Sequence, residues 1–267
     1  MNGISVVSIE LTSKCNKDCW MCGRRKLERE EINYSRTFGD MDFDLFRKIA
    51  KQIDPGVVVQ LHWNGEPSLY WNLEEAVTIL KRCGKYVSCN TNGLLLGMHW
   101  KAFLQFDSFA VSVIENDSLE NYKEQLFQLK HFMDLTEGCR RPLIVIRELG
   151  NVPTWFREVE GVVVATRTLH APEMSNKYRK PPTIPEVGVC QDLLHHIAID
   201  RHGYVFPCVR MNPRGLNCIG KVGDYETLFD IINGKERNAI IAKHFNGLRK
   251  EVELCKDCDF YGCPTSR

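Results

Sequence analysis

Three cysteines near the N-terminus constrain this chain more than any other feature of its sequence. Cys15, Cys19 and Cys22 lie within eight residues, directly after the apolar run Ile4–Leu11. Thiolates are soft ligands that suit iron–sulfur clusters and zinc. Three of them can hold three corners of a cubane 4Fe–4S cluster and leave the fourth iron open to a small molecule. A structural zinc site normally takes four ligands, and no histidine stands near this loop to complete one.

The composition is that of a soluble globular protein. The chain has 267 residues, of which 43% are hydrophobic and 26% charged, and its formal net charge is +1. This balance gives no reason to expect nucleic acid or an anionic membrane as a partner. No apolar run approaches the roughly 18 residues of a membrane span, and the first residues do not resemble a secretory signal. Twelve cysteines in such a chain predict a cytoplasmic protein, because clustered thiols in a reducing compartment usually bind metals or catalyse.

Strand and helix patterns alternate from residue 4 to residue 169. Nearly continuous apolar segments indicate parallel strands that are buried on both faces. A closed eight-unit barrel needs about 250 residues, so this shorter stretch predicts an α/β fold with an open, partial (β/α)6 barrel. The functional site of such a fold lies at the carboxyl ends of the strands, which is where the three cysteines follow the first strand. The predicted strands are Ile4–Leu11, Val57–Trp63, Tyr86–Asn92, Phe109–Ile114, Leu143–Leu149 and Val162–Leu169.

Polar residues predict where three of the intervening helices begin. Asp42 is expected to cap one helix, and Asn72 with Glu75 forms the pattern of a capping box. Asp117 and Glu120 are expected to open a long helix. The buried stripe of that long helix is predicted to consist of Leu119, Tyr122, Leu126, Leu129 and Met133.

The cysteine loop resembles the C-x3-C-x2-C signature of the radical S-adenosylmethionine (SAM) enzymes. This resemblance implies that Cys15, Cys19 and Cys22 hold a SAM-binding 4Fe–4S cluster and are the catalytic cysteines. It also implies that SAM is cleaved reductively to a 5′-deoxyadenosyl radical, which abstracts a hydrogen atom from the substrate. Met21 stands where the family usually has an aromatic residue near the adenine, and its thioether can fill the same apolar role.

Further segments resemble the SAM site of this family. The sequence Asn64-Gly65-Glu66-Pro67 resembles the G-G-E-P motif, with Asn64 in place of the first glycine. The resemblance implies that Gly65, Glu66 and Pro67 hold the amino group of SAM.

Two later strand ends carry further candidates. Asn92 lies in a segment similar to the family's T-N-G, although a turn explains that segment nearly as well. Ser112 on the fourth strand is implied to contact the ribose or carboxylate of SAM. His62, Trp63 and Glu148 also lie near strand ends and are candidate proton acceptors or substrate contacts, or core residues.

The last part of the chain holds a second group of cysteines around a predicted hairpin, Ile197–Asp200 with Tyr204–Pro207. It resembles the SPASM/twitch extension of radical SAM enzymes, in which cysteines bind auxiliary clusters. Four thiolates in a structural zinc site remain an alternative, and Cys218 and Cys263 are spare residues that can replace one of the four ligands. The resemblance implies that one auxiliary 4Fe–4S cluster is bound by Cys190, Cys208, Cys255 and Cys258.

The remaining cysteines, Cys83, Cys89 and Cys139, fall inside helix-like or strand-like patterns. We expect them to be buried core thiols without a chemical role.

Together these patterns predict a radical SAM core over residues 1–169, a linker over residues 170–187 and a twitch domain over residues 188–267. The resemblance extends to twitch-type dehydrogenases, which implies oxidation or rearrangement of a small polar metabolite such as a sugar, cyclitol or nucleoside. The auxiliary cluster is then the electron acceptor, and a flavodoxin-type or ferredoxin-type protein is the expected reductant. Alternatives are a radical SAM enzyme that modifies a peptide or protein, and a non-catalytic module that binds an iron–sulfur cluster or zinc.

Overall fold

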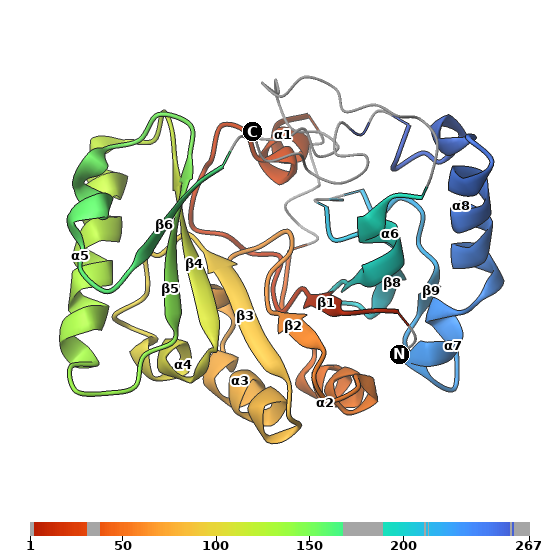
Figure 1. The fold of residues 1–267 in the computed structure, drawn as a ribbon, viewed down its shortest axis with the longest axis horizontal. Coiled ribbons are helices and arrows are strands. Elements are labelled where there is room, and N and C mark those ends of the chain that lie inside the picture. Colours follow the sequence, from red (N-terminus) through yellow and green to blue (C-terminus); the bar gives the residue numbers. More distant parts are fainter. Residues whose placement is uncertain are drawn as a thin grey trace.

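The computed structural model describes residues 3–30, 38–167, 189–210, 212, 214–256 and 258. Its framework is a nine-stranded sheet with the order β6-β5-β4-β3-β2-β1-β7-β8-β9 (Figure 1). All six predicted core strands are present, with shifts of a few residues at their ends. The strands are β1 Val6–Ile9, β2 Val58–Gln60, β3 Tyr86–Thr91, β4 Ser108–Ile114, β5 Leu143–Leu149, β6 Val163–Arg167, β7 His196–Ile199, β8 Tyr204–Phe206 and β9 Gly220–Lys221.

Strands β1 to β6 pair in parallel, each with its neighbour in the chain. Helices α2 to α5 cover one face of this curved sheet (Figure 1). The predicted α/β partial barrel is therefore confirmed. The α-helices are α1 Gly23–Glu30, α2 Phe43–Gln52, α3 Leu73–Arg82, α4 Trp100–Gln105, α5 Leu119–Leu135, α6 Gln191–His195, α7 Leu228–Ile232 and α8 Lys235–Phe245; short 3-10 helices are η2 Pro67–Leu69, η3 Thr154–Glu158 and η4 Arg249–Glu251.

Only part of the predicted capping is present. The Asp42 side chain accepts hydrogen bonds from the first backbone N–H groups of α2, as expected. Asn72 precedes α3 but its side chain makes no capping hydrogen bond, so the predicted capping box is wrong. Helix α5 is capped by Ser118, whose Oγ accepts from the N–H of Asn121 at 3.1 Å, one residue after the expected Asp117.

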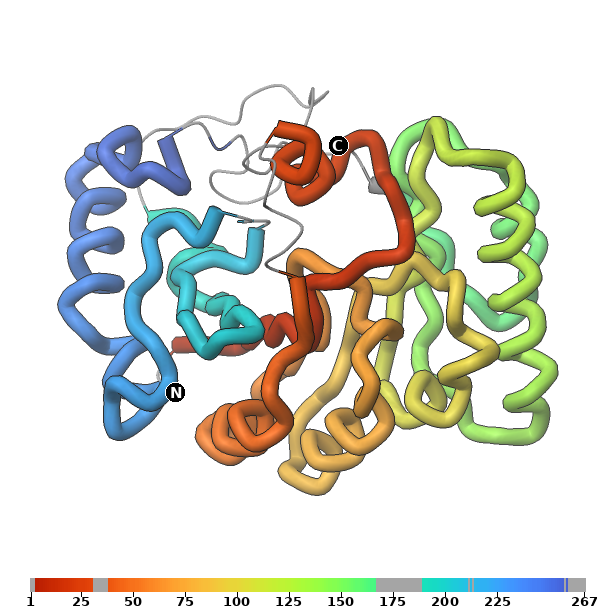
Figure 2. Tube along the Cα trace, turned by 180° about the vertical axis from the view of Figure 1, so that it is seen from behind, coloured from red at the N-terminus to blue at the C-terminus, as the bar shows by residue number. Residues whose placement is uncertain are grey.

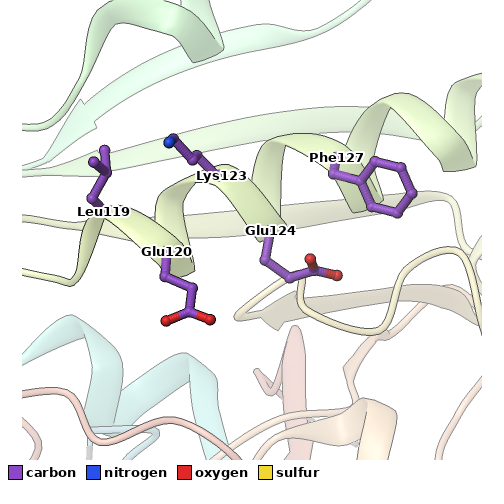
Figure 3. A pocket seen from close by; sticks show the side chains of 5 residues that line it. All are labelled: Leu119, Glu120, Lys123, Glu124 and Phe127. Atoms are coloured by element: carbon purple, nitrogen blue, oxygen red, sulfur yellow. The ribbon is translucent and has the colours of Figure 1, made fainter.

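Helix α5 also differs from its predicted stripe. Leu119 is 56% exposed, and it lines a shallow hollow on the helix together with Phe127 and three charged residues (Figure 3). Gln125 is fully buried instead. Its Nε2 donates to the carbonyl oxygens of Asn92 and Ser112, at 2.5 and 3.0 Å, so the buried amide nitrogen has hydrogen-bond partners. Hydrophobic spacing alone does not predict a buried glutamine whose side chain donates hydrogen bonds to backbone carbonyl groups.

The C-terminal segment extends the same sheet. Strand β7 pairs in parallel with β1, and β7 and β8 form the predicted antiparallel hairpin. Helix α8 buries Arg237, whose Nη2 donates to the carbonyl oxygens of Leu193 and Leu194 at 2.8 and 2.9 Å. The predicted linker 170–187 and Cys263 lie outside the described residues. None of the helices in the described ranges has the length and apolar character needed to span a bilayer.

The core between α5 and the sheet should dominate stability. Phe132 is fully buried, and its ring meets Phe109 edge-on at 5.5 Å. We expect Phe132→Ala to lower the free energy of unfolding by about 3–5 kcal/mol because it leaves a cavity. Phe245→Ala, at a side chain that is 75% exposed, should change it by less than about 0.5 kcal/mol. Chemical denaturation measures both, and equal losses in the two variants would contradict this account of the core.

Candidate functional site

The three N-terminal cysteines lie on the loop between β1 and α1, at the carboxyl edge of the sheet (Figure 2). All three are partly buried. Burial raises the pKa of the Cys15 thiol and raises that of Cys19 to about 12, and the neighbouring Cys22 adds to both shifts. The thiols are therefore close enough to influence one another, and burial disfavours the thiolate form of Cys15 and Cys19.

Helix α1, which the sequence patterns do not predict, anchors this loop. The guanidinium group of Arg25 donates to the carbonyl oxygens of Cys15 and Lys17, at 3.0 and 2.8 Å. Glu28, one turn along the helix, holds the same guanidinium at 2.5 Å. The loop is thereby fixed through its backbone, which leaves the thiols available.

Two further contacts fix the loop to the end of β4. Lys17 is buried and forms an ion pair of 2.5 Å with Asp117. The indole N–H of Trp20 donates to the carbonyl oxygen of Glu115 at 2.8 Å. The sequence gives no periodic signal for either contact, because the partners are about a hundred residues apart.

The segment Asn64-Gly65-Glu66-Pro67 packs directly against the cysteine loop. A Cβ atom at Gly65 would overlap the carbonyl oxygen of Thr12 and come within 2.7 Å of that of Lys14. The N–H of Glu66 donates to the carbonyl oxygen of Lys14 at 2.8 Å. Only glycine fits at position 65, so the two motifs that resemble a SAM site form one structural unit.

The carboxylate of Glu66 is buried beneath this unit. It accepts from the N–H and hydroxyl of Ser68, from the hydroxyl of Thr91 and from the N–H of Asn92, at 2.6–3.1 Å. Burial raises the pKa of Glu66, and these hydrogen bonds oppose that rise. The side chain thus joins the ends of β2 and β3, and its implied contact with the amino group of SAM remains a prediction.

The other implied SAM contacts surround the same place. The side-chain amide of Asn92 donates to Asn16 in the cysteine loop at 2.7 Å. Ser112 is partly buried on β4, and Met21 is partly buried in the loop. Pro67 begins the short helix η2. Their contacts with SAM stay predictions.

The three further candidates at strand ends have different environments. His62 accepts from the N–H of Asn90 at 3.1 Å, and burial lowers its pKa to about 3, so it is neutral. Trp63 donates its indole N–H to the carbonyl oxygen of Arg210 at 3.0 Å. Glu148 is almost fully buried and holds Arg157 through both carboxylate oxygens, at 2.9 and 2.7 Å. Its carboxylate is thus occupied by an ion pair.

Four C-terminal cysteines come together from separate segments. Cys190 directly precedes α6 and Cys208 follows β8, while Cys255 and Cys258 follow η4. Burial raises the pKa of Cys208 well above its ordinary value, and Cys190 adds to the shift. Burial raises the pKa of Cys255 to about 12, with further contributions from Cys258 and Cys190. Cys190 thus contributes to the raised pKa of both Cys208 and Cys255.

Two arginines hold the segments around these cysteines. Arg249 donates to the carbonyl oxygens of Cys255 and Cys258, at 2.6 and 3.1 Å. The N–H of Arg210 lies 3.4 Å from the Sγ of Cys208. Cys218, by contrast, is exposed and directs its Sγ to the carbonyl oxygen of Gly220 at 3.2 Å.

The two thiol groups fit iron–sulfur clusters by their chemistry. Across the described ranges, no three His, Cys, Asp or Glu side chains have the spacing of ligands around a single metal ion. Thiolates that hold a cubane lie farther apart than such ligands, because each binds a different iron. A set of three soft donors and a set of four are those that 4Fe–4S clusters use.

Comparison with known protein families decides the assignment. The model of the radical SAM superfamily matches residues 9–119, and the model of SPASM, an iron–sulfur cluster-binding domain, matches residues 190–259. The chain therefore carries a radical SAM domain followed by a SPASM domain. Its two domain types imply a SAM-binding 4Fe–4S cluster and auxiliary iron–sulfur binding.

Two curated relatives match part of this radical SAM chain. One is a tungsten-containing aldehyde ferredoxin oxidoreductase cofactor-modifying protein of Pyrococcus furiosus, 35% identical over 91 residues, which are 33% of this chain and 24% of the relative. The other is the S-adenosyl-L-methionine-dependent 2-deoxy-scyllo-inosamine dehydrogenase of Niallia circulans, 32% identical over 73 residues, or 26% of this chain and 27% of the relative. Both alignments span about a quarter of the relative's length.

Solved structures share the fold over nearly the whole chain. BtrN, in complex with AdoMet and 2-DOIA, matches with a TM-score of 0.65 at 19% identity, over 96% of this chain and 92% of BtrN. SuiB of Streptococcus suis, bound to S-adenosylmethionine, matches with a TM-score of 0.63 at 13% identity, over 97% of this chain and 73% of SuiB. At these identities the likeness establishes a common architecture.

Of the three cysteines expected in the core, only Cys89 is fully buried. Cys83 is partly buried at the end of α3. Cys139 is exposed, so that prediction is wrong. It lies in the turn after α5, where its N–H donates to the carbonyl oxygen of Thr136 at 3.1 Å.

The sequence patterns did not predict one buried acid that lies beside the radical SAM motifs. Glu10 is 4% exposed at the end of β1, and its Oε2 accepts from the N–H of Arg201 at 3.3 Å. Burial, with the charge of Asp200 and despite the amide of Asn64, raises its pKa to about 7. The residue is hidden inside the apolar run Ile4–Leu11, whose pattern indicates only a strand.

Replacement of Glu66 should separate its structural role from a role in binding. Glu66→Gln places an NH2 group against internal donors, so we expect the free energy of unfolding without SAM to fall by about 1–3 kcal/mol. Glu74→Gln, at an exposed position of α3, is the matched control. Unchanged stability of Glu66→Gln, measured by thermal unfolding of the SAM-free protein, would contradict this structural role.

Glu10 should make stability depend on pH. Because its pKa rises from 4.5 to about 7 on folding, its contribution is complete below about pH 4.5 and is lost as the pH rises through about 7. The free energy of unfolding, measured relative to the permanently neutral Glu10→Gln, should therefore fall by up to about 3 kcal/mol across this range. A difference between wild type and Glu10→Gln that stays constant with pH would rule this out.

Proposed function

We propose that this protein is a radical SAM oxidoreductase that acts on a small polar metabolite such as a sugar, cyclitol or nucleoside. The observation that carries the proposal is the packing of Gly65 and Glu66 against the cysteine loop. The same sheet continues into β7 and β8, which lie between Cys190 and Cys208 in the chain. The loop after β1 carries the first cysteines, and β7, which pairs with β1, follows Cys190 with only the short helix α6 between them.

The first site belongs to the radical SAM core. Cys15, Cys19 and Cys22 hold a 4Fe–4S cluster, which when bound supplies the electron that cleaves SAM to methionine and a 5′-deoxyadenosyl radical. Arg25 fixes the loop that carries these thiols by holding the carbonyl oxygens of Cys15 and Lys17.

The SAM pocket is proposed from the surrounding residues. Gly65 allows close approach of its backbone, and Glu66 and Pro67 order the turn after β2. Asn92 orders the end of β3 through Glu66 and Asn16. Met21 and Ser112 are the proposed contacts with the adenine and with the ribose or carboxylate.

The second site is proposed to accept an electron from the substrate radical. Cys190, Cys208, Cys255 and Cys258 hold an auxiliary 4Fe–4S cluster, which with four thiolates has no open iron and supplies an electron acceptor. Removal of a hydrogen atom from an alcohol carbon leaves a carbon radical. Loss of the hydroxyl proton and of one electron from that radical gives a ketone, so an oxidation of this kind needs a nearby acceptor.

The similar proteins favour two classes of reaction. The 2-deoxy-scyllo-inosamine dehydrogenase supports oxidation of a small molecule, and BtrN, solved with 2-DOIA, shares the fold over 92% of its length. SuiB, which has also been solved with the precursor peptide SuiA, favours peptide modification as the second candidate. We infer a cytoplasmic protein that receives electrons from a flavodoxin-type or ferredoxin-type reductant.

The decisive experiment counts iron after anaerobic reconstitution and measures 5′-deoxyadenosine formed from SAM. Wild type should bind about eight irons and form 5′-deoxyadenosine, and a triple variant with alanine at Cys15, Cys19 and Cys22 should bind about four and form none. Cys218→Ala, at an exposed thiol, is the matched control and should retain about eight. The substrate search then begins with polyhydroxylated metabolites.

Two results would contradict the proposal in different ways. About four irons in wild type and none in the triple variant, with zinc retained, would make the second site structural and the reaction redox-neutral. SAM that binds to fully reconstituted protein without being cleaved would make the chain a non-catalytic binding module.

A further inference from the structure

Trp63 connects the radical SAM core to the segment that carries Cys208. It follows β2 and precedes the segment Asn64-Gly65-Glu66-Pro67, yet its indole N–H donates to the carbonyl oxygen of Arg210 at 3.0 Å. Its ring also lies 5.1 Å from that of Phe206. The indole therefore touches the chain two residues before and two residues after Cys208.

Arg210 is held from a second direction. Its Nε and Nη2 donate to Oδ2 of Asp192, at 3.1 and 2.8 Å. Asp192 lies on α6, two residues after Cys190, and its side chain is 13% exposed. Trp63 thus fixes the carbonyl group of Arg210 while Asp192 fixes its guanidinium group.

These two contacts together fix the position of the backbone N–H of Arg210. The backbone N–H of Arg210 lies 3.4 Å from the Sγ of Cys208. A donor at this position stabilises negative charge on the sulfur, and hydrogen bonds to ligand sulfurs are among the factors that set the potential of an iron–sulfur cluster. Reduction adds negative charge, so the donor favours the reduced state.

We propose that Trp63 is a positioning residue that raises the reduction potential of the auxiliary cluster by fixing Arg210 with its N–H toward Cys208. This inference rests on the proposed function, because it takes Cys208 as a ligand of that cluster. It gives the core domain an influence on its electron acceptor, through the indole hydrogen bond to Arg210. A purely structural Trp63 would instead affect loading and stability alone.

The test uses the triple variant that lacks Cys15, Cys19 and Cys22, so that only the auxiliary cluster remains. In this background Trp63→Phe keeps an aromatic ring against Phe206 but has no N–H to donate. We expect unchanged iron and sulfide content and a more negative midpoint potential in a redox titration followed by electron paramagnetic resonance. In D2O the coupling of the exchangeable amide deuteron to the cluster should also weaken.

Matched variants separate the possible outcomes. Trp71→Phe, at a side chain that is 67% exposed, should leave the potential unchanged. Arg210→Lys, which leaves Trp63 in place but loses the two-point contact with Asp192, should shift the potential in the same direction as Trp63→Phe, and it serves as the test if Trp63→Phe does not load iron. An unchanged potential in a loaded variant overturns this inference alone, whereas a triple variant without iron overturns the auxiliary cluster and the inference together.

Discussion

The two-sided pairing of β1 is the constraint on which the rest of this structure depends. Val6 pairs with Val58 of β2 on one side and with His196 of β7 on the other, in parallel on both sides. Parallel strands bring their carboxyl ends to the same edge. The cysteine loop after β1, the segment around Gly65 after β2 and the turn after β7 therefore lie at one edge of the sheet. Strand β8 runs antiparallel to β7 and leads to Cys208, and more than a hundred residues separate the first cysteine group from the second.

Burial creates an electrostatic problem at both cysteine groups. Burial disfavours the thiolate form of Cys19 and Cys255, and neighbouring thiols add to the effect at both sites. The surrounding arginines donate mainly to backbone carbonyls, as Arg25 and Arg249 do. The protein thus orders the peptide around each thiol group, and it leaves the charge of the thiolates to be balanced by the iron that they bind.

Polar side chains at the strand ends perform most of this ordering. Glu66 accepts four hydrogen bonds from neighbouring segments, and Gln125 on α5 donates to carbonyl groups at the ends of β3 and β4. Buried groups of this kind are costly unless they are satisfied. Trp63 extends the same principle across the sheet to Arg210, which links the two cysteine groups through the β2 segment.

Several features could be predicted because they depend on short-range chemistry. Apolar runs fixed the six core strands, since burial on both faces requires them, and cysteine spacing indicated both thiol groups. The prediction was wrong at Leu119 and Cys139, because exposure at a helix end or a turn depends on what packs there. The capping box at Asn72 was also wrong, since a suitable residue pair does not oblige the side chain to turn toward the helix.

The sequence by itself determined the six core strands, the thiol chemistry and the two domain types, because all three are encoded in residues close together in the chain. Only the tertiary structure decided that β7 joins β1, that Glu10 is buried beside Arg201, and that Trp63 reaches Arg210. These contacts join residues 147 or more positions apart. Their formation depends on how the whole sheet is assembled, and no local pattern of hydrophobicity or spacing contains that information.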